Sequence, residues 1–128
     1  MKVLLINGSP VYYASANATL IAVLDRLFHS SHFDKTMKVG AAVASARRGG
    51  LTATFDELNK YFTISGMPVA SGQYWNGIHG SNAKDAVQDE EGMQQMRIQI
   101  FRTKIKGAIP NYAKHHKNPL HLLRQHLP

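Results

Sequence analysis

Three short apolar runs, each followed by a loop and then by a helical pattern, most constrain what this chain can fold into. The runs occupy residues 2–7, 39–44 and 67–71. Each is too short for an average helix and mainly apolar, which is typical of strands buried on both faces. Strand–loop–helix units repeated along a chain of 128 residues predict one α/β domain, with a parallel sheet and helices on its faces.

Helical periodicity follows each of these runs. Apolar residues recur on one helical face over residues 18–29, so a helix is predicted there with Asn17 or Ser15 as its N-cap. A second helix is predicted from residue 51 to residue 62. A third is predicted over residues 85–106, with acidic residues in its first turns and basic residues in its last, as the helix dipole prefers.

The loops that follow the predicted strands carry most of the chemistry in the chain. They span residues 8–17, 45–50 and 72–80, and they are rich in glycines, hydroxyls, arginines and aromatic rings. The carboxyl ends of parallel strands lie at one edge of a sheet, where α/β proteins bind their ligands. The sequence therefore predicts a ligand site formed by these three loops.

The first of these loops suits a phosphate. Residues 8–10 read Gly-Ser-Pro directly after a strand, and Ser15, Asn17 and Thr19 lie at the start of the next helix. Backbone N–H groups and hydroxyls at a helix entry can donate hydrogen bonds to an anion. The alternative is a plain strand-to-helix turn in which these side chains only cap the helix.

The other two loops offer flat rings and positive charge. Tyr12 and Tyr13 in one loop, with Tyr74 and Trp75 in another, can stack on a planar ligand or simply pack at the rim of the sheet. Residues 47–50 read Arg-Arg-Gly-Gly, which places cations and flexible backbone at a strand end. These cations can stabilise an anionic ligand or cap backbone carbonyls.

Positive charge is concentrated at the carboxyl end of the chain. The formal net charge is +7; residues 1–91 hold eight basic and eight acidic residues, whereas residues 92–128 hold seven basic residues and no acid. A basic tail of this kind is either a solvated extension or a surface for nucleic acid. Nucleic acid is the less favoured partner because the tail lacks interleaved aromatic residues and any known motif.

Several classes of site and location are disfavoured. The chain has no cysteine, which excludes disulfides and thiolate metal sites. The acids at 89–91 are expected to be a solvated helix turn, His79 a hydrogen-bonding loop residue, and the tail histidines incidental, so no metal site is predicted. No apolar run is long enough to cross a membrane, and no export signal is recognised, so the expected location is the cytoplasm.

Four stretches, in this order along the chain, resemble the NADPH-dependent FMN reductases of the flavodoxin-like superfamily, including their iron–sulfur flavoprotein-like branch. They are residues 1–10, residues 10–13 with Leu24-Asp25-Arg26, residues 46–50, and residues 74–80 followed by Asp89-Glu90-Glu91-Gly92. The resemblance ends near residue 106. The basic, histidine-containing tail at 110–128 has no counterpart, so the domain is expected to span residues 1–109.

The resemblance implies FMN as the cofactor, NAD(P)H as the electron donor and a homo-oligomeric state. Hydride would pass from NAD(P)H to the flavin and on to an acceptor, and no side chain is assigned as catalytic. Ser9, with Asn17 and Thr19, would hold the phosphate, and Tyr74 and Trp75 would make secondary ring contacts. The residues expected to border the ring or contact its polar edge are Pro10, Val11, Tyr12, Tyr13, Ala46, Arg47, Arg48, Gly49 and Gly50.

One departure from the family pattern stands out at residues 7–13. Residues 1–10 resemble the family's first strand and phosphate loop, whereas residues 9–28 resemble its third-strand loop and the helix after it. About two strand–helix units, roughly 60 residues, are therefore absent between these signals. The expected fold is a flavodoxin-like sheet shortened to about three strands, with an apolar face that a second subunit or the tail's leucines must cover.

Two functions follow from this interpretation. The leading hypothesis is a shortened FMN-binding oxidoreductase of the NAD(P)H-dependent FMN reductase type. The alternative is a non-catalytic flavodoxin-like protein that acts only through subunit association. Flavin absorbance in the purified protein distinguishes them.

Overall fold

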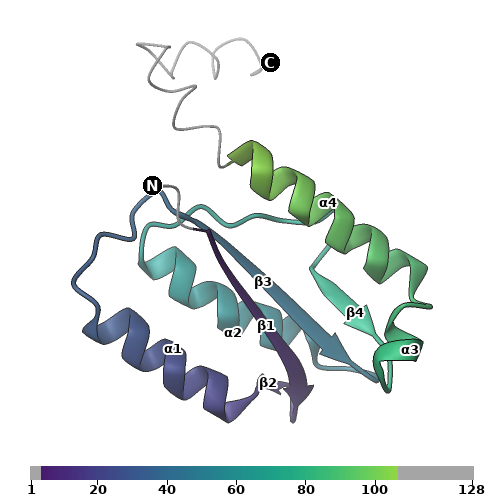
Figure 1. The fold of residues 1–128 in the computed structure, drawn as a ribbon. Helices are drawn as coiled ribbons and strands as arrows, with labels where there is room; N and C mark the ends of the chain where they lie inside the picture. The colour runs from purple at the N-terminus through teal and green to yellow at the C-terminus, as the bar shows by residue number, and fades with distance from the viewer. Residues whose placement is uncertain (1–3, 107–128) are drawn as a thin grey trace, which may run out of the picture.

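The computed structural model describes residues 4–106, which form a four-stranded sheet in the order β2-β1-β3-β4 (Figure 1). β1 (Leu4–Tyr12), β3 (Val39–Ala46) and β4 (Gly77–His79) are parallel, and β2 (Ser15–Ala16) pairs antiparallel with β1. The predicted α/β class and the first two parallel strands are confirmed, whereas the third parallel strand, β4, lies within residues 72–80, where a loop was predicted. The two-residue β2 was not predicted.

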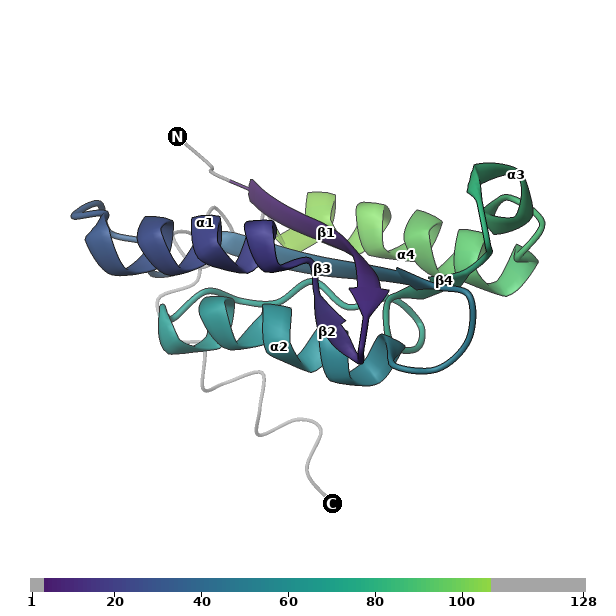
Figure 2. The ribbon, with the colours of Figure 1, turned by 90° about the horizontal axis from the view of Figure 1, so that it is seen from below.

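Helices cover both faces of this sheet. α1 (Ala18–Ser30) and α2 (Leu51–Ile64) lie on one face, and α4 (Glu90–Lys106) lies on the other, after the short α3 (Ala83–Ala86) (Figure 2). The first two helices begin at the residues the sequence predicted. The main core lies between β3 and these two helices, and its buried residues are Ala16, Leu24, Ala42, Leu58, Phe62 and Met67.

Small residues in β3 let α2 approach the sheet closely. A Cβ atom at Gly40 would lie 2.4 Å from the ring of Phe62, so only glycine fits beneath that ring. Ala42 and Ala44 on the same face are fully buried. This close contact anchors α2, whose first turn forms one wall of the site described below.

β1 corrects the prediction of a loop at residues 8–17. The strand continues through Gly8, Ser9 and Pro10, which pair in parallel register with Val43, Ala44 and Ser45. Turn-forming residues are thus held in a strand by pairing along most of the length of β3. The two family signals that overlap at Ser9 and Pro10 therefore form one continuous strand.

Only Tyr13 and Ala14 remain as a turn between β1 and β2. Both have positive φ, 52° and 59°, as a two-residue hairpin requires. Neither is a glycine or asparagine, so the turn has an unfavourable composition for its shape. The ladder of β1 and a hydrogen bond network at β2 hold it in place: Glu57 of α2 accepts bonds from the Ser15 hydroxyl and the Ala16 N–H.

The predicted third strand at residues 67–71 is interrupted rather than continuous. Val69 makes one isolated parallel bridge to Gly40, and regular pairing resumes only at β4. Between them, residues 71–76 leave the sheet as a loop. The aromatic pair Tyr74 and Trp75 lies in that loop.

The predicted helix over residues 85–106 is broken in two. α3 ends at Ala86, and α4 begins only at Glu90. Asp89 causes the break, because its side chain accepts the N–H of Gly92 at 2.9 Å and so starts a new helix in place of continuing the old one.

One face of β1 is left bare among the described residues. Ile6 is 53% exposed, because α4 packs on β3 and β4 but not on this part of β1. The predicted uncovered apolar surface is therefore present. The tail leucines proposed to cover it, and the tail itself, lie outside the described residues.

Candidate functional site

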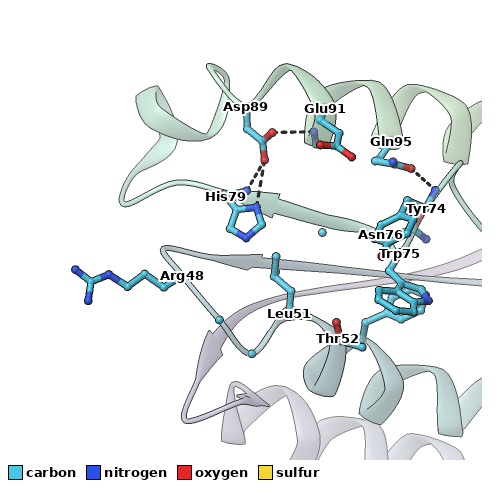
Figure 3. A pocket seen from close by; sticks show the side chains of 15 residues that line it. Arg48, Leu51, Thr52, Tyr74, Trp75, Asn76, His79, Asp89, Glu91 and Gln95 are labelled. Atoms are coloured by element: carbon cyan, nitrogen blue, oxygen red, sulfur yellow. Dashed lines mark hydrogen bonds and ion pairs between the residues drawn. The ribbon is translucent and has the colours of Figure 1, made fainter.

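A pocket of about 360 Å³ extends along β4, from the aromatic loop before it to the carboxyl ends of β3 and β4. Three segments line it: residues 48–52 at the start of α2, residues 74–79, and the first turns of α4. In Figure 3 the aromatic pair Tyr74 and Trp75 lies at one end of the pocket, and His79 and Arg48 lie at the other. This is the edge of a parallel sheet at which the sequence predicted a ligand site.

The first wall depends on a glycine. Gly50 has φ +98°, and a Cβ atom there would lie 2.8 Å from Cγ1 of Val11 and 3.0 Å from Cα of Ala14. A side chain is therefore excluded on two grounds, strain and space. The β3–α2 loop thus touches the β1–β2 hairpin, so the structure brings two of the predicted loops together at this point.

The second wall carries the exposed aromatic pair. The ring centroids of Tyr74 and Trp75 lie 4.7 Å apart with an interplanar angle of 46°. Their side chains are 62% and 53% exposed. Two large rings held at a pocket mouth and left open to solvent offer flat apolar surface to a ligand.

Buried amides hold this aromatic loop in place. Asn76 is fully buried; its Oδ1 accepts the N–H of Gly72 at 2.7 Å, and its Nδ2 donates to the carbonyl of Ala42 at 3.2 Å. Gln99 of α4 donates to the same Ala42 carbonyl at 3.1 Å. Two side chains thereby satisfy a β3 carbonyl next to the gap in the fourth strand.

A third amide connects the loop to the opposite wall. Gln95 of α4 is 6% exposed, and its Oε1 accepts the N–H of Tyr74 at 2.7 Å. The loop is therefore positioned from both β3 and α4. Asn76, Gln95 and Gln99 were not predicted, because their partners lie 4 to 57 residues away in the chain and no local pattern marks them.

Asp89 differs from the prediction of a solvated acidic turn. Its Oδ2 accepts the backbone N–H of His79 at 2.7 Å and lies 3.6 Å from Nδ1 of the same ring. Hydrogen bonds from the backbone of Gly92 and of His79 hold its pKa below the usual value, since they favour the charged form. Glu90 and Glu91 are exposed, as predicted, although Glu91 lines the pocket.

Ser9 and Asn17, two of the three residues predicted to bind the phosphate, have side chains that are hydrogen-bonded within the protein. Ser9 is 5% exposed; its hydroxyl donates to the carbonyl of Pro10 at 2.7 Å and accepts the N–H of Asn17 at 2.8 Å. Asn17 is the N-cap of α1, and its Oδ1 accepts from Thr19 N at 3.0 Å and from Leu20 N at 3.4 Å. Asn17 therefore caps α1, as its position in the sequence predicted.

The remaining predicted residues divide into two groups. Arg48, Gly49 and Gly50 line the pocket; Arg47 is exposed and Ala46 is buried at the end of β3, and neither lines it. Pro10, Val11, Tyr12 and Tyr13 lie on the β1–β2 hairpin, behind the wall formed by Gly50. Residues that line the pocket without having been predicted as site residues are Leu51, Thr52, Phe55, Asn76, Gly77, His79, Asp89, Glu91, Gly92 and Gln95.

Sequence signals for part of this missed set do exist. The helix that follows the predicted loop begins with Leu51, Thr52 and, one turn later, Phe55. Its first turns could therefore have been expected at the same edge of the sheet as that loop. Gly92 lies in the first turns of α4, where a Cβ atom would meet Ile78 at 2.7 Å. A glycine inside a helix often marks such close packing.

A family model, NADPH-dependent FMN reductase, matches residues 2–82, which is more than half of the chain. The chain belongs to this family. The fold of this chain is similar to that of a solved structure, the flavodoxin, WrbA-like protein from Agrobacterium tumefaciens, with a TM-score of 0.59 and 16% identity. The match covers 88% of this chain and 67% of that one. No curated protein sequence matches this member of the FMN reductase family.

Two further structural findings concern residues 4–106 alone. No helix in that range is long and apolar enough to cross a bilayer. Within the same range, His, Asp and Glu side chains form no group of three that could hold a metal ion.

Proposed function

We propose that the pocket binds the isoalloxazine ring of FMN and that the chain is an NAD(P)H-dependent oxidoreductase. One observation carries the proposal: the exposed aromatic pair before β4, and the Gly-Gly loop beside Arg48 at the carboxyl end of β3, line the same pocket. Membership of the FMN reductase family supports it. The pocket volume of about 360 Å³ lies within the usual range for small-molecule sites.

The residues of the pocket fit a flat ring with a polar edge. Tyr74 and Trp75 present exposed ring faces, and Leu51 and Phe55 add apolar surface. Backbone groups at Gly49 are accessible, because no atom lies within 4 Å of where its Cβ would be. Bound FMN would supply the hydride-accepting ring, and the protein would supply position and charge around it.

Arg48 is the pocket residue we assign to the charge of a reduced flavin. It lies at the end of the β3 ladder, is exposed and lines the pocket, whereas its neighbour Arg47 is exposed but does not line it. A guanidinium near an anionic ring stabilises that charge and raises the fraction of reduced flavin. The hairpin residues Pro10 to Tyr13 are proposed as an outer border on the far side of Gly50.

Trp75 makes this proposal directly testable because it is the single tryptophan of the chain. Titration of the protein with FMN should quench the intrinsic tryptophan fluorescence in a saturable way. Anaerobic NADPH should then bleach the visible absorbance of the bound flavin. Unchanged tryptophan fluorescence at every FMN concentration would rule the proposal out.

A second function, association through subunits without catalysis, is supported by the bare face of β1. Ile6 is 53% exposed on a strand whose outer edge pairs with β2 only at Val11 and Tyr12 among the described residues. A second subunit would cover both features. Light scattering should show a dimer or larger assembly that Ile6→Glu dissociates, and a monomeric wild-type protein would exclude this function.

A further inference from the structure

We infer that the pocket recognises the ring of the flavin and not its phosphate, so that riboflavin binds as tightly as FMN. This inference depends on the proposed flavin site. It concerns the class of ligand, because a site without a phosphate anchor accepts any molecule that carries the isoalloxazine ring.

The first argument is the state of Ser9. Its hydroxyl already donates one hydrogen bond, to Pro10, and accepts another, from Asn17, and the residue is 5% exposed. A phosphate could use this hydroxyl only after those bonds were broken and the side chain was uncovered. A buried group that loses its partner incurs a desolvation penalty that offsets the new contact.

The second argument is the conformation of the backbone around Ser9. A loop can wrap its N–H groups around an anion, but Gly8, Ser9 and Pro10 are paired with β3 in a regular ladder. Pro10 has no N–H to offer in any conformation. This segment therefore cannot form a cradle without losing strand pairing in the centre of the sheet.

The third argument is the amino end of α1. Asn17 caps it through the N–H groups of Thr19 and Leu20, and the N–H of Ile21 donates to the Asn17 carbonyl at 3.1 Å. Two of the N–H groups that could attract an anion to this helix terminus, those of Thr19 and Leu20, are therefore already bonded within the protein.

The fourth argument is the charge of the pocket itself. Arg48 contributes one positive charge to the lining, whereas Asp89 and Glu91 contribute two negative charges. Hydrogen bonds to Asp89 keep its carboxylate ionised at neutral pH. A phosphate placed in the pocket would face both carboxylates, and the neutral ring of an oxidised flavin would not.

The test compares FMN, riboflavin and lumiflavin, which lacks the ribityl chain, by quenching of Trp75 fluorescence in the full chain. FMN and riboflavin should have dissociation constants within about threefold of each other, and inorganic phosphate should not compete with either. A phosphate held by one charge-assisted hydrogen bond would make FMN at least about tenfold tighter. That result would overturn the inference and leave the flavin site standing.

Failure of the flavin site itself gives a different result, because none of the three flavins would then quench Trp75, and both proposals would fall. Thr19→Ala removes the exposed hydroxyl of the predicted phosphate set and should leave the FMN-to-riboflavin ratio unchanged. Arg48→Gln should weaken both flavins by the same factor, with Arg47→Gln as the matched control. Selective weakening of FMN by either Thr19→Ala or Arg48→Gln would place the phosphate there and contradict the inference.

Discussion

The β1–β2 hairpin and the aromatic loop before β4 lie on either side of Gly50, yet they use their polar groups in opposite ways. At the hairpin, the Ser9 hydroxyl bonds to the backbone of Asn17, and Glu57 of α2 accepts the N–H of Ala16, so these polar groups hold the chain to itself. In the aromatic loop, buried amides behind the surface support rings that remain open to solvent. The aromatic loop is therefore the region suited to binding, because the residues that hold it in place are not the residues that are free to contact a ligand.

Among the variants that test this difference between the two regions, the largest loss of stability is expected at Asn76. Asn76→Ala should lower the free energy of unfolding by about 2–4 kcal/mol, because it leaves the Gly72 N–H without its buried partner and removes one donor from Ala42. Chemical denaturation measures the loss. The matched control is Asn82→Ala, which removes the exposed N-cap of the four-residue α3 and should cost about 1 kcal/mol or less. Equal losses for the two variants would contradict the supporting role of Asn76.

The next largest effects are expected from two variants, one in each region, that should change different properties of the protein. Ser9→Ala should cost about 1–2 kcal/mol of stability, because the Asn17 N–H loses its partner, and should leave flavin affinity unchanged. Trp75→Ala should leave stability within about 0.5 kcal/mol and weaken flavin binding about tenfold. Denaturation and flavin fluorescence measure the two properties. A Ser9 variant that loses flavin affinity would show that the hairpin contributes to binding directly.

The acidic cap of α4 is expected to give a smaller, pH-dependent effect. Asp89 has a folded-state pKa below its unfolded value, so its contribution is present above the unfolded pKa and is lost as pH falls through the folded one. Asp89→Asn removes the charge and one of the two oxygens that accept the N–H groups of His79 and Gly92, so it should cost about 1 kcal/mol at pH 7, and the difference from wild type should shrink below about pH 4. Thermal unfolding at pH 7, 5 and 3 measures it. A difference that is the same at all three values would exclude an ionised cap.

The smallest effect is expected at the contact between α1 and α2. The Tyr61 hydroxyl donates to Asp25 at 2.5 Å, and burial and that carboxylate raise the pKa of Tyr61 to about 12. Its contribution is therefore present below the unfolded pKa near 10 and is lost as pH rises from about 10 to 12. Tyr61→Phe should cost about 0.5–1 kcal/mol at pH 7. When the tyrosines are titrated at alkaline pH by their absorbance, the ionisation at the highest pH should be missing in this variant. A titration curve identical to that of the wild type would refute the assignment.

The parts of the fold that local pattern controls were predictable. α1 and α2 begin where the apolar spacing begins, and Asn17 is the cap that its position suggested. β3 was recognisable because a run of small apolar residues between two loops suits a buried strand. The edge of the sheet that carries the pocket followed from the order of strands and helices alone.

What the sequence concealed depends on contacts distant in the chain. Gly8, Ser9 and Pro10 have the composition of a turn, and only pairing with β3 makes them a strand. Pro10 is tolerated because backbone nitrogens alternate in direction along a strand; its nitrogen therefore points with that of Tyr12, toward β2 and away from β3. The gap in the fourth strand is closed by Asn76 and Gln99, whose partner Ala42 is 34 and 57 residues away.

The interrupted fourth strand has a consequence for how this molecule can change. Val69 and β4 both pair in parallel with β3, but in different registers: Val69 pairs with Gly40 and Gly77 pairs with Ala44, so eight residues of the chain span four residues of β3 and the extra length forms the loop. Insertions or exchanges in that segment leave the register of both halves intact, provided that Asn76 is retained. Exchange of this short segment, in evolution or by design, can therefore change the ligand preference of the protein while the strands on either side stay paired with β3.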